Sequence, residues 1–137
     1  MLVKTLSIVL VLLFMIGCSD DAEITLYKSV KKVEKPLPCM RLVVFPPDEQ
    51  IQRVADKHFH FTQGCRYRVV ISKKSGIVCN SNQNAQEKAL SSFPSGFIRL
   101  DLYDGATPLY SYYKDLTTRV KDKDIAQGLE RLKKDMF

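Results

Sequence analysis

The chain holds few of the residue types from which catalytic and metal sites are built. Its two histidines, His58 and His60, stand seven and five residues before Cys65. A pair at i, i+2 near the expected end of a helix is not the spacing of a zinc site. No two cysteines form a Cys-x-x-Cys pair, which would lower a thiol pKa for redox work. We therefore predict no enzyme, no metal site and no cofactor, and assign no catalytic residue.

Tyrosines gather in one stretch towards the C-terminus. The stretch, with the cations near it, comprises Arg99, Tyr103, Tyr110, Tyr112, Tyr113 and Lys114. Tyrosine is large, rigid and amphipathic, and is therefore favoured at binding surfaces. It is also common in strands, where it simply packs against its neighbours. The group is either strand packing or the surface that meets a partner, and the polar loop 80–84 is the second candidate surface.

The first residues have the composition of an export signal. Lys4 precedes Leu6–Ile16, an uncharged apolar run of 11 residues. A helix that spans a bilayer needs about 20 apolar residues. The hydrophobic region of a signal peptide needs only about 7 to 15. We therefore interpret residues 1–17 as a signal peptide and not as a membrane span or a buried core helix.

The segment Met15-Ile16-Gly17-Cys18 resembles the lipobox of bacterial lipoproteins, and the resemblance covers residues 1–19. It implies diacylglycerol on Cys18, cleavage after Gly17, and N-acylation of Cys18 by a chain such as palmitate. One myristoyl chain binds a membrane only marginally, whereas two or three longer chains anchor a protein stably. Ser19 resembles the residue that directs lipoproteins to the outer membrane. We expect a protein anchored to the periplasmic face of that membrane, in preference to the inner membrane.

Three cysteines remain if Cys18 carries lipid. Cys39, Cys65 and Cys79 would then lie in an oxidising compartment, where disulfides persist. The expected outcome is one disulfide and one unpaired cysteine. All three pairings stay open, because the sequence does not determine connectivity.

The charge of the chain favours neither nucleic acid nor any other single partner. The chain has 21 basic and 15 acidic residues, and the leader contributes only Lys4. The bases are spread along the chain and acids interrupt them. An exported protein does not meet the chromosome, so we expect no nucleic acid. The alternative function is a binding module for a small molecule or for an anionic envelope polymer such as peptidoglycan or lipopolysaccharide, which a basic surface allows.

Hydrophobic periodicity predicts one α+β domain. Strands are expected at residues 40–45, 65–71, 77–79, 97–103 and 109–114, with a turn at 72–76. Helices are expected after Asp48, over residues 84–90, and from about residue 122 to the C-terminus. The order is β-α-β-β-(α)-β-β-α, an antiparallel or mixed sheet of about five strands with two amphipathic helices on one face. The domain is placed at residues 39–137.

Residues 18–38 are expected to be the lipidated N-terminus and a tether. Twenty extended residues would reach about 65 Å, although residues 24–27 could form a short strand that docks on the domain. The strand end Val43-Val44-Phe45-Pro46 and the β-α-β-β-β-α core resemble periplasmic lipoprotein domains of the TolB amino-terminal type. Together these features predict a non-enzymatic accessory that binds another envelope or secretion-assembly protein.

Overall fold

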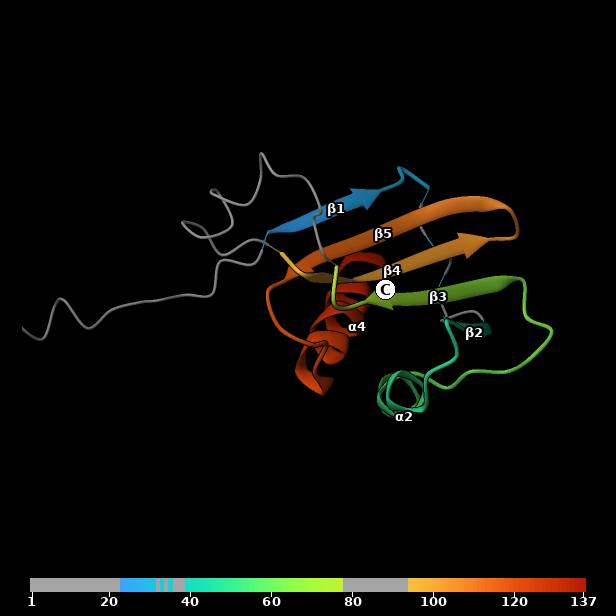
Figure 1. Ribbon diagram of the computed structural model, residues 1–137. Coiled ribbons are helices and arrows are strands. Elements are labelled where there is room, and N and C mark those ends of the chain that lie inside the picture. The colour runs from blue at the N-terminus through green and yellow to red at the C-terminus, as the bar shows by residue number, and fades with distance from the viewer. Residues whose placement is uncertain (1–22, 32, 34, 36–38, 78–93) are drawn as a thin grey trace, which may run out of the picture.

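The computed structural model describes residues 23–31, 33, 35, 39–77 and 94–137. Within these residues there are five strands and two helices, in the order β-β-α-β-β-β-α (Figure 1). The strands are β1 (Ile24–Lys28), β2 (Met40–Phe45), β3 (Tyr67–Lys74), β4 (Gly96–Asp104) and β5 (Thr107–Leu116), and the helices are α2 (Glu49–His58) and α4 (Asp122–Met136). The predicted α+β class with a five-stranded sheet and two helices is confirmed.

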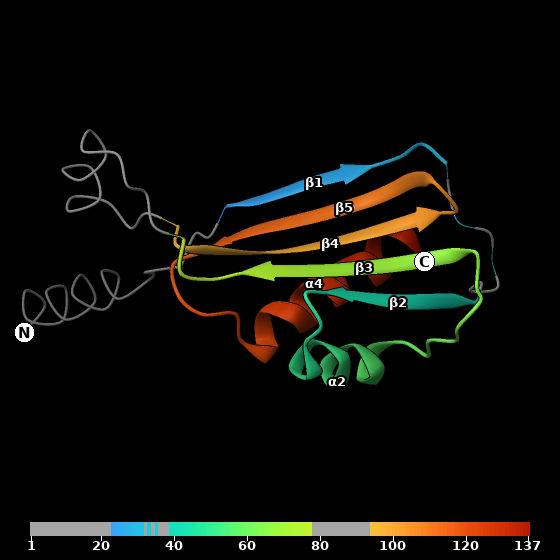
Figure 2. The same cartoon turned by 45° about the vertical axis from the view of Figure 1, so that its right-hand side comes forward.

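The sheet is mixed, with β2 as the strand that runs parallel to its neighbour. Its order is β1-β5-β4-β3-β2, visible from top to bottom in Figure 2. β2 and β3 are parallel and are joined through α2, as parallel neighbours require a crossover. The other three neighbouring pairs are antiparallel. The expected hairpin is confirmed as β4 and β5, with Gly105 in its turn at a φ of 61°.

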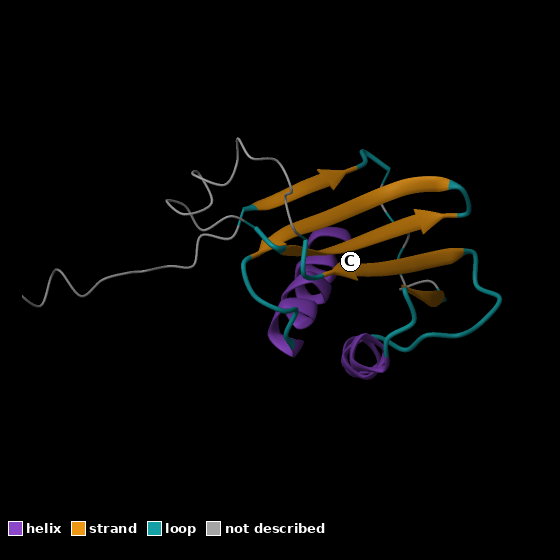
Figure 3. Cartoon of the chain, in the orientation of Figure 1, coloured by secondary structure: helices purple, strands orange, loops and turns teal. Residues whose placement is uncertain are grey.

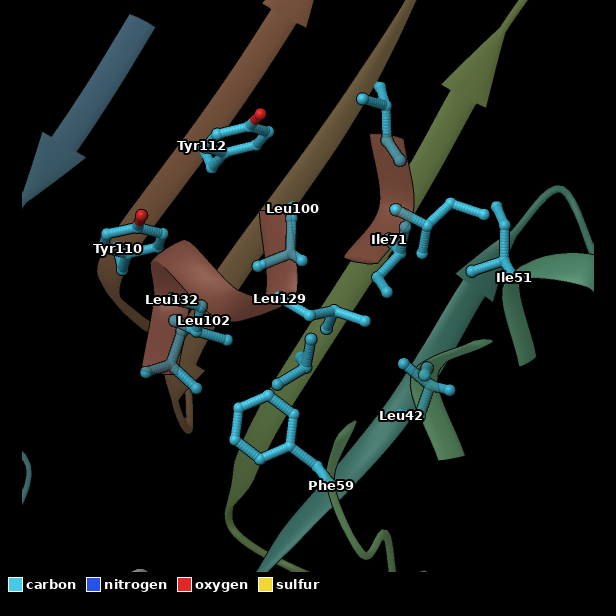
Figure 4. Packing of buried hydrophobic residues seen from close by; sticks show 14 of the residues in the cluster. Leu42, Ile51, Phe59, Ile71, Leu100, Leu102, Tyr110, Tyr112, Leu129 and Leu132 are labelled. Carbon is cyan, nitrogen blue, oxygen red and sulfur yellow. The ribbon is translucent and has the colours of Figure 1, made fainter. Parts of the chain in front are cut away.

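Both helices lie on the same face of the sheet (Figures 1 and 3). Their apolar sides meet alternate strand residues, and Figure 4 shows Leu100, Leu129 and Leu132 among the packed side chains. These three leucines are fully buried. Burying one such side chain stabilises the fold by about 1.5 to 3 kcal/mol.

The α2 helix begins where the sequence predicts. Asp48 is its N-cap, and the Asp48 carboxylate accepts a hydrogen bond of 3.1 Å from the Ile51 N–H. Glu49 in the first turn and Lys57 in the last turn suit the helix dipole. Ile51 is fully buried, so the predicted apolar face is the one that packs on the sheet.

The α4 helix carries a buried carboxylate at its start and a glycine at its centre. The Asp124 carboxylate accepts hydrogen bonds from the Lys121 backbone N–H (2.9 Å) and from Lys114 Nζ (3.0 Å). A Cβ at Gly128 would lie 3.2 Å from Cε1 of Tyr112. Gly128 therefore lets the helix approach the aromatic ring of β5, which offsets its low helix propensity.

The sheet departs from the expected element boundaries in two places. The expected tether contains β1, which pairs with β5 over Ile24–Lys28, and Val33 further along is buried. The sheet thus begins before Cys39. β3 continues to Lys74, so most of the expected 72–76 turn is strand, because residues 72–74 go on pairing with residues 97–99 of β4. Ile77 is not in a strand, and residues 78–79 and the helix expected at 84–90 lie outside the described residues.

One of the three cysteine pairings is formed, between Cys39 and Cys65. The two residues precede β2 and β3, which are parallel neighbours, so their Cα atoms are 5.6 Å apart. A bond that closes a loop of 26 residues stabilises the fold by about 3 to 4 kcal/mol in the chain-entropy account. Cys79 lies outside the described residues.

The contact at Gly128 gives a test of the helix-to-sheet packing. We expect Gly128→Val to lower the free energy of unfolding by about 1 to 3 kcal/mol, since the new side chain would overlap the Tyr112 ring. Glu130→Val, at an exposed position of α4, is the control for β-branching and should cost about 0.5 kcal/mol. Denaturant unfolding measures both. Equal losses in the two variants would contradict the close approach.

Candidate partner-binding surface

The sheet has a second face that neither helix covers, which we call the open face. It is formed by the strand residues that alternate with the core positions. Its aromatic members are Tyr27, Phe45, Phe97, Tyr103 and Tyr113, and its cations are Arg41, Arg68, Lys74 and Arg99. Phe45 is 70% exposed, Tyr27 53% and Val43 36%. The open face therefore joins exposed apolar groups with positive charge.

Two arginines stand side by side at one end of the open face. Arg41 on β2 is directly opposite Arg68 on β3, and Arg68 is opposite Tyr103 on β4. The Arg68 guanidinium lies 4.8 Å from the centre of the Tyr103 ring, a cation–π contact. The Nε atoms of both arginines are buried and have no hydrogen-bond partner among the described residues. This pair is the least satisfied polar feature of the face.

The middle of the open face satisfies its own charges. Arg99 pairs with Asp101 on the same strand at 2.9 Å. Phe97 stacks on Tyr113 with ring centres 5.3 Å apart. The Tyr113 hydroxyl donates to Asp115, and burial together with that carboxylate raises the pKa of Tyr113. The charged and polar side chains of this patch therefore have partners within the patch.

The expected tyrosine surface is divided between the two faces of the sheet. Arg99, Tyr103 and Tyr113 lie on the open face. Tyr110 and Tyr112 are buried beneath α4 (Figure 4), so the expectation that they form a partner surface is wrong. The reason is the two-residue period of a strand, which sends Tyr112 and Tyr113 to opposite faces.

On the core face, polar contacts with α4 hold Tyr110 and Lys114, whereas the buried Tyr112 hydroxyl has no hydrogen-bond partner among the described residues. The Tyr110 hydroxyl donates to Asp135 at 3.1 Å, and burial followed by this carboxylate raises the pKa of Tyr110. Burial, with Asp124 nearby, raises the pKa of Tyr112 to about 12. Lys114 is 13% exposed and is paired with Asp124, so it too is engaged in the fold and not on the open face.

Asp104, at the end of β4, ties the segment after β1 to the sheet. Its carboxylate is 4% exposed and accepts from Lys31 Nζ at 2.6 Å and from Arg66 Nε. The hydrogen bond from Lys31, followed by that from Arg66, lowers the pKa of Asp104 below its usual value of 3.8. The chain that leaves β1 is thereby fastened at the same end of the sheet as Arg41 and Arg68.

Outside the open face, the remaining candidates for a functional site among the described residues are the histidines and a pocket. Within the residues that the structure describes, no group of three histidine, cysteine or acidic side chains is placed to hold a metal ion. His58 is half-buried at the end of α2, and His60 is exposed. A shallow pocket of about 520 Å³ is lined by Ser75, Gly76, Ser95, Thr117, Thr118 and Arg119. It holds hydroxyl groups and one cation, but no acid and base within reach of one another.

Across the same described part of the chain, none of the helices has the length and apolar character needed to cross a membrane. Comparison of the chain with protein-family models, with curated proteins and with solved structures finds no match.

The arginine pair is the part of this surface that the sequence analysis missed. Arg41 and Arg68 each alternate with buried residues of their strands, which places them on the face opposite the core. That parity is visible in the sequence. Their proximity is not, because it depends on the parallel register of β2 with β3.

The shifted pKa of Asp104 gives a test of the contacts at this end of the sheet. Because the folded-state pKa lies below the unfolded one, the contribution of Asp104 is complete above about pH 4 and is lost as the pH falls through the folded value. We expect Asp104→Asn to lose less stability than the wild type between pH 6 and pH 3, measured as the free energy of unfolding. Glu130→Gln, an exposed carboxylate on α4, should keep the wild-type dependence. An Asp104→Asn profile parallel to the wild type would refute the assignment.

Proposed function

We propose that this chain is a lipid-anchored lipoprotein of the bacterial envelope whose open face binds another envelope or secretion-assembly protein. The open face is the observation that carries the proposal, because it exposes Phe45 on the same strand as Arg41 and Tyr27 at the opposite edge of the sheet. Protein interfaces are enriched in aromatic residues and arginine at their centres. The role is that of an accessory which docks and positions, not of an enzyme.

The lipobox-like segment supports the anchor, and β1 supports a short connection to it. Ile24, the first residue of β1, comes six residues after Cys18. Six residues span at most about 20 Å. A lipidated Cys18 would therefore hold the start of the sheet close to the bilayer surface, not on the long tether that 20 free residues would provide. Partners attached to the same membrane would come within reach of the open face.

Ser19 supports the periplasmic face of the outer membrane as the location. This assignment is carried by the resemblance to sorted lipoproteins.

A second function has one observation in its favour. On the open face four cations stand against two acids, Asp101 and Asp115. A basic surface with aromatic side chains suits an anionic envelope polymer such as peptidoglycan or lipopolysaccharide. Binding of that kind should weaken steeply with salt, whereas a largely apolar protein interface should not.

The anchor is tested by the chemistry of Cys18. We expect the mature protein to begin at Cys18 and to carry the mass of a diacylglyceryl group and an N-acyl chain, as measured by mass spectrometry of the protein extracted from envelopes. Cys18→Ser should remove the acyl mass and release the protein from the membrane fraction. An intact leader, or a soluble wild-type product with a free thiol at Cys18, would overturn the anchor.

The docking face is tested by site-specific photocrosslinking in cells that make the full chain. A photoreactive residue in place of Phe45 should give one discrete adduct with an envelope protein. The same residue in place of Gln52, exposed on α2, is the matched control and should give none. Equal adducts from both positions, or none from Phe45 in intact envelopes, would contradict docking through the open face.

A further inference from the structure

We infer that Arg41 and Arg68 form a carboxylate-binding site for an acidic segment of the partner protein. The inference rests on the proposed function, in which the open face is the docking surface, and it adds the chemistry of the group that the partner presents.

The arginine pair lacks a counter-charge among the described residues, as does Lys74 at the other end of the open face, but only the two arginines lie directly opposite one another. Two like charges directly opposite one another on adjacent strands destabilise a sheet. Lys73 is paired with Asp48, and Lys114 with Asp124, as Arg99 is with Asp101. Neither Arg41 nor Arg68 forms an ion pair with any described residue. An anion from outside the domain would supply the negative charge that the sheet does not place beside these arginines.

The guanidinium groups bear an uncompensated charge, and that of Arg68 is held in place. Each Nε is buried without a partner among the described residues, which carries a desolvation cost, so an anion from outside would meet the terminal Nη groups. The Tyr103 ring fixes the Arg68 guanidinium at 4.8 Å. A guanidinium presents its N–H groups in a fork that matches a carboxylate. Two forks side by side favour one or two carboxylates.

The exposed apolar residues that follow Arg41 on β2 favour a protein as the source of the carboxylate. Along β2, Arg41 is followed at alternate positions by Val43 and Phe45, which are exposed on the same face. Alternate strand positions are about 6.6 Å apart. An extended acidic segment can present a carboxylate and then apolar side chains at that spacing. Glycan polymers and lipid headgroups carry anions but no series of apolar side chains.

The position of the pair also disfavours lipid headgroups. Ile24, where the chain enters the sheet from the anchor, lies in the row of Ile98. Tyr103, beside Arg68, is five residues further along β4, about 17 Å away. The arginine pair therefore stands at the end of the sheet remote from the attachment point.

The test uses the full lipidated chain in detergent micelles and defined probes. The main probe is a fluorescent peptide with threonine at every second position and with glutamate or valine at the positions between. The control peptide has glutamine in place of glutamate. Purified peptidoglycan sacculi and phosphatidylglycerol vesicles are the other two arms. Anisotropy measures binding, and the NMR signals of the arginine Nε–H groups show whether the contact is at the pair.

We expect the glutamate peptide to bind and the glutamine peptide to bind at least about tenfold more weakly. Arg41→Gln combined with Arg68→Gln should also reduce binding of the glutamate peptide at least about tenfold. Arg41→Lys combined with Arg68→Lys, which keeps both charges, should reduce it less. Arg53→Gln, on the exposed side of α2, should have no effect. Near-UV circular dichroism establishes that each variant is folded, and the single glutamine variants replace the double one if it is not.

Equal binding of the two peptides, an equal loss in Arg53→Gln, or arginine-dependent binding only to sacculi or vesicles would overturn the inference. The docking proposal fails separately. If the crosslink from Phe45 persists in the double glutamine variant while the peptides do not discriminate, the face still docks a protein but the carboxylate site is wrong.

Discussion

The side chains of α2 and α4 meet the same face of a five-stranded sheet, and this burial holds the domain together. Ile51, Ile71 and Leu129 are completely enclosed there, from a helix, a strand and the second helix. Since strand side chains alternate, every residue that enters this core sends its neighbour to the opposite face. Because α2 and α4 both pack on one face, the other face is covered by no helix of the described residues. The open face is therefore a consequence of the packing, and its composition decides what it can bind.

The participation of β1 changes how an anchor would act. A flexible tether would let the domain search a wide volume, whereas the pairing of β1 with β5 from Ile24 onward leaves five residues between Cys18 and the sheet. The ion pair between Lys31 and Asp104 then fastens the chain beyond β1 to the far end of the sheet. In the proposed lipoprotein, attachment through so short a connection would restrict the distance of the open face from the membrane. Such restriction would raise the effective concentration of the face for partners in the same layer.

Local patterns were sufficient to predict the class, both helices and the main hairpin. The Asp48 cap, the apolar stripe of α4 and the turn at Gly105 are each encoded within a few residues. The failures involve relations between distant segments. The residues around Ile24 do not indicate that β1 pairs with β5. The residues around Tyr112 do not indicate that Gly128 lets α4 cover the Tyr112 ring. Arg41 and Arg68 were missed for the same reason, since their adjacency exists only in the parallel register of β2 with β3.

A disulfide closes the end of the two strands at which this register begins. The bond between Cys39 and Cys65 joins the residues just before β2 and β3, whose parallel pairing places Arg41 beside Arg68. At the same end of the sheet, Arg66 and Lys31 converge on Asp104, the residue next to Tyr103. The arginines thus lie near both a covalent crosslink and an ion-pair cluster. Holding charged side chains in place before a ligand arrives reduces the ordering cost of binding. Two like charges side by side, with Nε donors that have no partner among the described residues, lower the stability of the free domain. In the proposed complex, an anionic partner would offset that loss.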